Sequence, residues 1–385
     1  MQTAPEIYSH AAVLIDAHTG ALIYSKNPED EIPPASLTKL MTMHLVMNEI
    51  KEGRASYDEI VPITIESWAQ SQPPRSSLMF LEPGQIVTLR EILLGLAVVS
   101  GNDAAVAAAL RLSPNMKEFA KKMTMEARNM GLYITRFAES SGISEYNKTT
   151  AEEFAFFCRN YLMAHPNSLD DFHSINEFAY PLAANVQERY KNYPRTIVQY
   201  NRNDLLRSTK GVDGLKTGFI YESGFNIAVT AKREDTRYIL ILLGGPNVRQ
   251  GASLRERDGR QLLEWAFELF KTVRPGEKEI ENAYPKTVKL WKGKENNAKI
   301  KLPQSADFTA PATRAKSLSF ETIIENPLTA PLEAGERVGY LVISDEKGEL
   351  SRAALVSQEN YEKGTVFKRI RHSIILFFRS FLMKS

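Results

Sequence analysis

The segment Pro34-Ala-Ser-Leu-Thr-Lys-Leu-Met-Thr42 lies where two prolines give way to a long apolar helical pattern. Ser36 and Lys39 are three residues apart, so they share one helical face. A serine hydroxyl needs a base to become a strong nucleophile, and a lysine whose pKa is lowered by burial can be that base. The free amide at a helix start also binds anions. The segment therefore predicts a nucleophile, its base and half of an oxyanion hole. Ser344 and Lys347 repeat the spacing in an expected hairpin turn, so the motif alone decides little.

Two further motifs make a catalytic role for the first more strongly supported. Ser100-Gly101-Asn102 precedes an alanine-rich helical stretch, where serine and asparagine commonly cap a helix. Lys216-Thr217-Gly218 follows Val212 on an expected strand, where Gly218 permits close backbone approach and the other two side chains can grip a carboxylate. Taken singly, the first of these motifs is explained as a helix cap and the second as a polar edge strand. Together, in this order and context, they form the motif set of serine acyl-transfer enzymes.

Residues 1–273 combine strand and helix patterns and predict an α+β domain. His18-Thr19-Gly20 forms the first expected hairpin turn, with glycine where a positive φ is needed. The helix that carries the first motif is apolar around much of its circumference, so we expect it to be central. The expected strands cover 11–16, 21–25, 211–219, 224–232 and 237–244, and the expected helices cover 37–47, 89–99, 104–112 and 261–273.

Residues 274–360 have the short strands and regular turns of a small all-β sandwich domain. Arg274-Pro275-Gly276 is the expected linker to it. The expected strands cover 287–291, 298–302, 318–323, 337–343 and 353–356.

A tail, residues 361–385, is basic and apolar. From Gly364 onward, apolar residues fall on one helical face and cations lie broadly opposite, which is typical of a helix lying in a membrane surface. The alternative is a terminal helix that packs on its own domain or on a partner. The apolar residues are Phe367, Ile370, Ile374, Phe377, Phe378 and Phe381, and the basic ones are Lys368, Arg369, Arg371, His372 and Arg379.

Composition excludes several classes of protein. The chain has 385 residues with 48 basic and 46 acidic side chains, so a nucleic-acid partner is not expected. Its single cysteine, Cys158, allows no internal disulfide or cysteine metal cluster, and we interpret it as a core thiol. The six histidines lack paired metal spacing and the glycines form no phosphate loop, so we expect no metal and no cofactor.

Nearly the whole chain resembles the D-alanyl-D-alanine carboxypeptidases, the low-molecular-mass penicillin-binding proteins. Beyond the three motifs, the resemblance includes Asn201–Leu206, Leu243-Gly-Gly245 and Leu262-Leu-Glu-Trp265, then the β domain and the amphipathic tail. It implies a β-lactamase/transpeptidase-like catalytic domain. It also implies a stem peptide of peptidoglycan that ends in D-Ala-D-Ala as substrate, and acylation by β-lactams.

The resemblance also implies roles for individual residues. Ser36 attacks the penultimate D-alanine carbonyl, and Lys39 is the general base. Ser100 and Asn102 complete the proton network, and Lys216 keeps Lys39 neutral by like-charge repulsion. Thr217 binds the terminal carboxylate beside the backbone of Gly218, and the amides of Ser36 and Phe219 form the oxyanion hole. Arg255 adds charge for the carboxylate, and Arg202 lines the same groove. Many relatives carry histidine at the position of Phe219.

Other functions stay open at this point. A serine β-lactamase is disfavoured because no Glu-x-x-Leu-Asn segment lies between Ser100 and Lys216. A D,D-endopeptidase usually lacks the C-terminal domain that is expected here. A non-catalytic wall-binding relative has no reason to keep Ser36, Lys39 and Lys216 intact. Because the implied substrate lies outside the cytoplasm, we expect an extracytoplasmic, peripheral membrane protein whose signal peptide has been removed, since residues 1–5 lack a signal pattern.

Overall fold

The structure is a computed structural model that describes residues 3–188, 191–192, 195–314 and 317–382. The chain divides into two compact units, Met1–Glu268 and Leu269–Ser385. Each is described by itself below.

The first unit contains an antiparallel sheet with strand order β2-β1-β7-β6-β5. The hairpin β1–β2 and the meander β5–β6–β7 form as predicted and meet where Val13 pairs with Ile241. Both expected groups of strands therefore join in one sheet. The strands are β1 (Ala11–Asp16), β2 (Leu22–Lys26), β5 (Val212–Ile220), β6 (Gly224–Arg233) and β7 (Thr236–Gly245), and a separate pair is β3 (Glu177–Tyr180) with β4 (Ile197–Tyr200).

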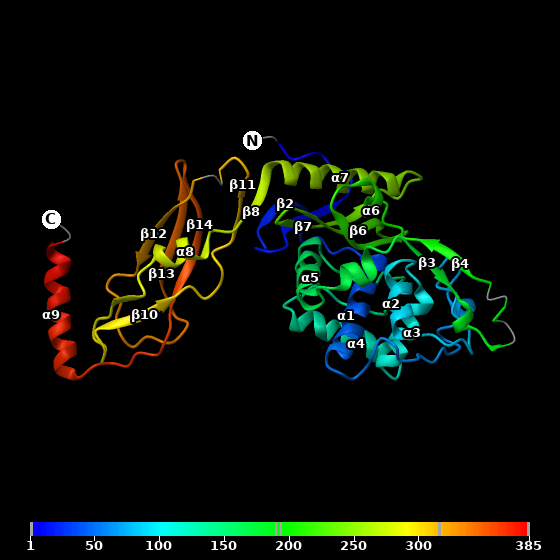
Figure 1. Ribbon diagram of the computed structural model, residues 1–385, viewed down its shortest axis with the longest axis horizontal. Helices are drawn as coiled ribbons and strands as arrows, with labels where there is room; N and C mark the ends of the chain where they lie inside the picture. Colours follow the sequence, from blue (N-terminus) through cyan, green and yellow to red (C-terminus); the bar gives the residue numbers. More distant parts are fainter. Residues whose placement is uncertain (1–2, 189–190, 193–194, 315–316, 383–385) are drawn as a thin grey trace. The chain divides into compact units, whose positions relative to one another are not determined.

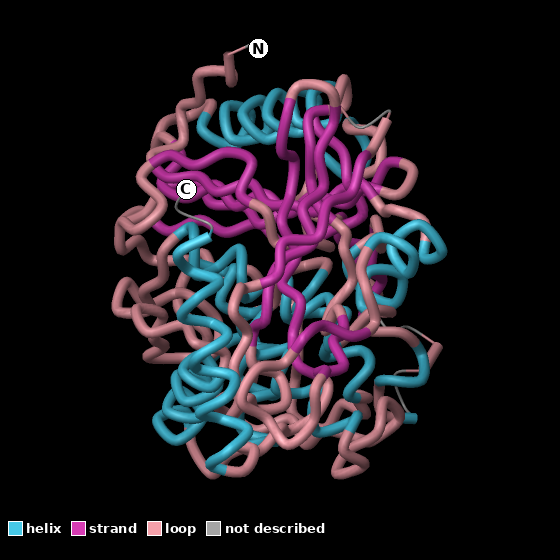
Figure 2. Tube along the Cα trace, turned by 90° about the vertical axis from the view of Figure 1, so that its left-hand side faces the viewer, coloured by secondary structure: helices cyan, strands magenta, loops and turns pink. Residues whose placement is uncertain are grey.

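Helices lie on both faces of this sheet (Figure 1). One face is covered by α7, whose Trp265 and Phe267 pack edge-on or tilted against Tyr24 and Tyr238 of the strands. The other face carries α1 to α5, a layering also visible in Figure 2, while α6 packs beside α7, where Arg260 donates to Ser208. The helices are α1 (Lys39–Lys51), α2 (Leu89–Ala97), α3 (Asn102–Leu112), α4 (Met116–Asn129), α5 (Ala151–Ala164), α6 (Leu205–Ser208) and α7 (Gly251–Leu269).

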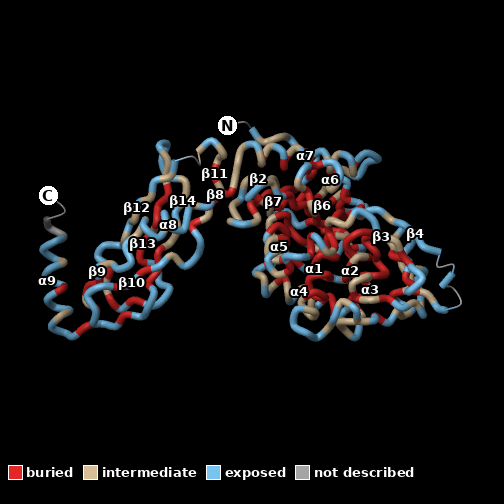
Figure 3. Tube along the Cα trace, in the orientation of Figure 1, coloured by how far each residue is buried: buried red, intermediate tan, exposed pale blue. Residues whose placement is uncertain are grey.

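The core lies between the sheet and the helical layer, where buried residues concentrate in Figure 3. Every residue of α1 from Lys39 to Met47 is buried, which confirms the predicted central helix. Burial on all sides is what an all-round apolar pattern requires. Cys158 is also buried in this core, as predicted, and burial raises the pKa of its thiol. Short helical turns complete the unit: η1 (Ala35–Thr38), η2 (Ala69–Ser71), η3 (Leu169–His173) and η4 (Ala183–Asn185).

The second unit contains a sheet with order β12-β13-β14-β10-β9 and a two-stranded pair, β11–β8. Phe308 of β11 and Ile343 of β13 belong to one buried cluster, so the pair packs on the larger sheet. The strands are β8 (Phe270–Val273), β9 (Thr287–Lys289), β10 (Asn297–Lys301), β11 (Phe308–Pro311), β12 (Ser319–Ile324), β13 (Arg337–Asp345) and β14 (Gly348–Ser357), and the helices are α8 (Glu277–Ala283) and α9 (Val366–Leu382).

Three local predictions were wrong. The helix expected over 261–273 begins earlier, at Gly251, and ends at Leu269, because Phe270–Val273 pairs with β11. The zone expected to be all β contains α8, whose first-turn Glu279 accepts from the Gly276 amide. The backbone N-cap of α3 is Gly101, with no side-chain cap.

Candidate active site

Ser36 lies in η1, a tight 3-10 turn that leads directly into α1. The preceding residue, Ala35, is buried and has a positive φ of 52°, a conformation that costs a non-glycine residue energy. β5 passes close behind this turn: a Cβ on Gly218 would lie 2.9 Å from the amide nitrogen of Ser36. Glycine in the Lys-Thr-Gly motif is therefore what allows the strand to approach the serine.

Lys39 is fully buried at the start of α1, and its Nζ contacts three oxygen atoms. It lies 3.1 Å from Ser36 Oγ, 2.8 Å from Asn102 Oδ1 and 2.6 Å from the carbonyl oxygen of Ser141. Burial lowers the pKa of Lys39 to about 7, an effect that Arg202 reinforces and that the carboxylates of Glu139 and Asp103 oppose. A substantial fraction of this amine is therefore neutral at physiological pH.

Asn102 is held from both sides. Its Oδ1 accepts from Lys39, and its Nδ2 donates to Ser76 Oγ at 3.1 Å. The neighbouring Asp103 is buried and accepts from three consecutive amides, those of residues 79–81, at 2.8–3.0 Å. Asp103 thereby fixes the segment that carries Ser76. Neither Asp103 nor Ser76 was predicted to be a site residue, although Asp103 follows the second motif directly.

Ser100 is buried and has a positive φ of 62° just before α3. Within the described residues, no hydrogen bond joins its hydroxyl to Ser36 or Lys39. The motifs therefore bring Ser36, Lys39 and Asn102 into direct contact, while Ser100 lies two residues away from the Asn102 that touches the lysine.

Lys216 and Thr217 are both buried on β5, and Lys216 Nζ donates to the carbonyl oxygen of Thr217 at 3.0 Å. Burial lowers the pKa of Lys216 well below its usual value, and the positive charges of Lys39, Arg202 and Arg255 lower it further. Both predicted arginines, Arg202 and Arg255, therefore lie near enough to Lys216 to lower its pKa. Burial is the largest cause of the lowered pKa at both lysines, and the repulsion between them adds to the shift at Lys216.

Arg255, on α7, is 5% exposed. Its Nη1 donates to the Asn226 carbonyl at 3.4 Å and its Nη2 to Glu256 at 3.3 Å, while its Nε has no partner among the described residues. A buried donor without an acceptor is costly. An arriving carboxylate would satisfy it.

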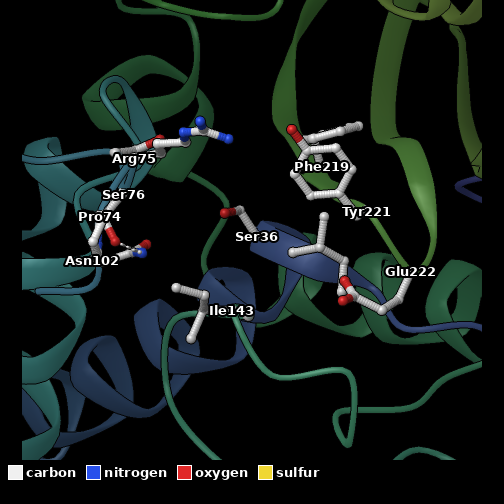
Figure 4. A pocket seen from close by; sticks show the side chains of 12 residues that line it. Ser36, Pro74, Arg75, Ser76, Asn102, Ile143, Phe219, Tyr221 and Glu222 are labelled. Atoms are coloured by element: carbon white, nitrogen blue, oxygen red, sulfur yellow. Dashed lines mark hydrogen bonds between the residues drawn. The ribbon is translucent and has the colours of Figure 1, made fainter. Parts of the chain in front are cut away.

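A cavity of about 360 Å³ opens in front of Ser36. Figure 4 shows the Ser36 side chain between the wall formed by Ser76 and Asn102 and the wall formed by Phe219 and Tyr221. The full lining is Ser36, Pro74, Arg75, Ser76, Ser77, Asn102, Gly142, Ile143, Phe219, Ile220, Tyr221 and Glu222. The hydroxyl that contacts the lysine is therefore open to a ligand, while the lysine itself is closed off from water.

A cavity-facing serine in contact with a buried lysine and an asparagine, beside a lysine-bearing sheet strand, defines a serine acyl-transferase of the penicillin-binding type. Residues 1–247 match the D-alanyl-D-alanine carboxypeptidase family, and residues 267–363 match the C-terminal domain of penicillin-binding protein 5. The chain belongs to this family of serine peptidases. The predicted family, fold class and enzyme class are confirmed.

Individual relatives match the chain over much or most of its length. The chain is 31% identical to the D-alanyl-D-alanine carboxypeptidase DacD of Escherichia coli K12, over 95% of this chain and 90% of the relative. Penicillin-binding protein 5 from Haemophilus influenzae superposes with a TM-score of 0.81 at 27% identity, covering 94% of this chain and all of that one. Penicillin-binding protein D2 from Listeria monocytogenes, solved in a cefotaxime-bound form, matches with a TM-score of 0.59 at 26% identity, over 69% of this chain and all of that one.

Proposed function

We propose that this chain removes the terminal D-alanine from peptidoglycan stem pentapeptides through an acyl-enzyme on Ser36. The observation that carries the proposal is the contact between Ser36 Oγ and the Nζ of a fully buried Lys39, at 3.1 Å and at the edge of the cavity.

Lys39 acts as the general base in this proposal. A neutral amine has two N–H donors and one lone pair. Asn102 Oδ1 and the Ser141 carbonyl can only accept, so they take the two N–H groups. The lone pair is then left for Ser36 Oγ, the one partner of the three that can give up a proton. The serine oxygen attacks the penultimate D-alanine carbonyl while its proton passes to Lys39.

The remaining motif residues handle the leaving group. Ser100, close to Asn102, relays the proton held by Lys39 to the departing D-alanine nitrogen as the peptide C–N bond breaks, which returns Lys39 to its neutral form. Lys216 and Lys39 repel each other when both are charged, which disfavours the protonation of both amines at once. Water then hydrolyses the ester on Ser36, with Lys39 again taking the proton, which regenerates the enzyme.

Substrate binding uses the strand side of the cavity. Thr217 and Arg255 bind the terminal carboxylate, and the unpartnered Nε of the buried Arg255 supports this role. Arg202 adds positive charge at the same end. The developing oxyanion lies between the amides of Ser36 and Phe219, and the close approach at Gly218 supports that pairing. The exposed ring of Phe219 faces the cavity but is not needed for this step.

The test is intact-mass spectrometry after incubation with penicillin, followed by peptide mapping and by an assay of D-alanine release from a pentapeptide. We expect one adduct, on Ser36, and its loss in Ser36→Ala. An adduct that persists in Ser36→Ala would show that the nucleophile is elsewhere. Hydrolysed penicillin without an adduct would indicate a β-lactamase instead.

We further propose that α9 holds the protein on the outer surface of the cytoplasmic membrane, where the substrate lies. Five apolar side chains of α9, at positions 367, 370, 374, 377 and 378, are between 52% and 87% exposed. Residues 383–385, the end of the predicted membrane segment 364–385, lie outside the described residues. No helix in the described ranges is long and apolar enough to cross a bilayer.

The membrane proposal is tested by deleting residues 366–385 and measuring sedimentation with anionic liposomes. We expect liposome binding to be lost and D-alanine release from a soluble pentapeptide to stay unchanged. Undiminished liposome binding would contradict the role of α9. We also propose three functional parts of the chain: a catalytic domain over residues 1–273, a β domain over 274–360 and a membrane helix over 361–385.

A further inference from the structure

Glu139 is a partly buried carboxylate next to the active site that the proposed chemistry does not use. It begins the loop that runs from residue 139 to 147 and gathers the donors of that loop. One oxygen accepts from the Ser141 amide at 2.6 Å and the Ser141 hydroxyl at 2.5 Å. The other accepts from the Gly142 amide at 2.7 Å and from Asn147 Nδ2 at 2.9 Å.

The hydrogen bonds of Glu139 connect to Lys39 through two residues, Ser141 and Asn147. The carbonyl oxygen of Ser141 accepts from Lys39 Nζ at 2.6 Å, the shortest of the three lysine contacts. Asn147 Nδ2 also lies 3.0 Å from Thr38 Oγ1, on the residue just before Lys39. The carboxylate therefore fixes both the loop carbonyl that the lysine touches and the turn from which the lysine projects.

Charge around Lys39 is divided between two sides. Arg202 supplies positive charge, which lowers the pKa of Lys39. Glu139 and Asp103 supply negative charge from the helical side, and of the two Glu139 has the larger effect on the pKa of Lys39, which it raises. Asp103 is occupied with the amides of residues 79–81. Among these charges, Glu139 therefore does most to raise the pKa of Lys39 against the effects of burial and Arg202.

We propose that Glu139 is a positioning residue for catalysis: it holds the Ser141 carbonyl against Lys39 and sets the pH at which Lys39 becomes the base. This inference rests on the proposed function, because it assumes that Lys39 takes the proton of Ser36. It adds to that function a residue outside the three motifs, with a measurable effect on the pH profile.

The experiment is the pH dependence of the acylation rate with a fluorescent penicillin, for the full chain and three variants. Glu139→Gln removes the charge and keeps the shape. We expect its acidic limb to move to lower pH by about 0.5–1 pH unit, because a nearby negative charge no longer favours protonated Lys39. Glu139→Asp keeps the charge but withdraws it from the loop amides, so we expect a rate at least about tenfold lower with the limb unmoved. Glu145→Gln removes an exposed charge from the same loop and should leave rate and limb unchanged.

The outcomes separate this inference from the proposed function. A wild-type profile without an acidic limb near pH 7 would mean that Lys39 is not the base, and both would fail. A normal wild-type limb that Glu139→Gln leaves in place, or moves to higher pH, overturns only the role of Glu139. If Glu139→Gln does not fold, Glu139→Asp still decides, since a wild-type rate in that variant would overturn the positioning role.

Discussion

The amide oxygen of Asn102 accepts a hydrogen bond from the Nζ of Lys39 at 2.8 Å, across 63 positions of the chain. The acceptor is neutral, so it orients the amine while stabilising its charged form less than a carboxylate would. Both residues are buried, so a charge on either one would interact strongly with the other. The neutrality of this acceptor is therefore part of how Lys39 stays available as a base.

Asn102→Asp replaces that neutral acceptor with an isosteric carboxylate. We expect the midpoint of the acidic limb of the acylation rate to rise by about 1–3 pH units, because an opposite charge in contact favours protonated Lys39. This is opposite in direction to the shift expected for Glu139→Gln. Stopped-flow acylation by a fluorescent penicillin between pH 5 and 10 measures it. A limb that stays in place would mean that Lys39 does not control the rate.

The proposed role of Lys39 predicts the direction in which the rate of the wild-type enzyme changes with pH. Burial lowers the pKa of Lys39 to about 7, and the proposed mechanism uses its neutral form as the base. Acylation should therefore rise about tenfold per pH unit below pH 7 and level off above it. The measurement is kcat/KM for pentapeptide hydrolysis from pH 5 to 9. A rate that falls as the pH rises through 7 would contradict a neutral lysine base.

Gly142→Ala tests how closely the loop of Ser141 packs on the serine turn. Gly142 has a φ of 87°, and a Cβ there would lie 1.8 Å from the carbonyl oxygen of Ala35. Gly131 has a similar φ of 82° but nothing within 4 Å of its Cβ position. Gly131→Ala should cost about 1–2 kcal/mol of unfolding free energy from strain alone. Gly142→Ala should cost about 2 kcal/mol more and slow acylation. Equal losses in urea titrations of both variants would show that the contact is not tight.

Much of the site was accessible from sequence because its side chains lie in short motifs with distinctive residue types. Ser36, Lys39 and Asn102 meet as the motif set predicts, and a cavity lies in front of the serine. Ser141 was not accessible. It contacts Lys39 through a backbone carbonyl from 102 positions away, and every residue has such a carbonyl. Glu139 acts on Lys39 through that same loop, so its role depends on tertiary structure that local spacing does not carry.

The fold shows the same limit. Antiparallel strands with alternating or buried patterns, such as β5, β6 and β7, were found close to their observed bounds. Phe270–Val273 was assigned to a helix because its apolar residues continue the pattern of α7. In the structure it pairs with β11, about 40 residues further along, and long-range pairing overrides local preference.

His372 connects α9 to the β domain. It is 6% exposed, whereas its neighbours along the helix are largely exposed. Its Nδ1 accepts from the Lys292 amide at 2.8 Å, and its ring lies edge-on to Trp291 with centroids 5.2 Å apart. At about 100° per residue, His372 points roughly opposite to the face formed by Phe367 and Ile374. Docking through His372 therefore turns the apolar face of α9 away from the β domain.

This docking should weaken in acid. Burial lowers the pKa of His372, and Lys368, Lys289 and Arg371 lower it further, so the docked helix prefers the neutral ring. Its contribution to stability is present above about pH 6.5, the unperturbed value, and is lost as the pH falls, by at most about tenfold in the docking equilibrium per pH unit. Hydrogen exchange of the α9 amides at pH 7.5 and 5.5, corrected for intrinsic rates, measures it. His372→Asn offers a non-titrating acceptor near the Nδ1 position and should flatten the difference between the two pH values. If wild type and His372→Asn lose protection equally in acid, the histidine is not the group that titrates.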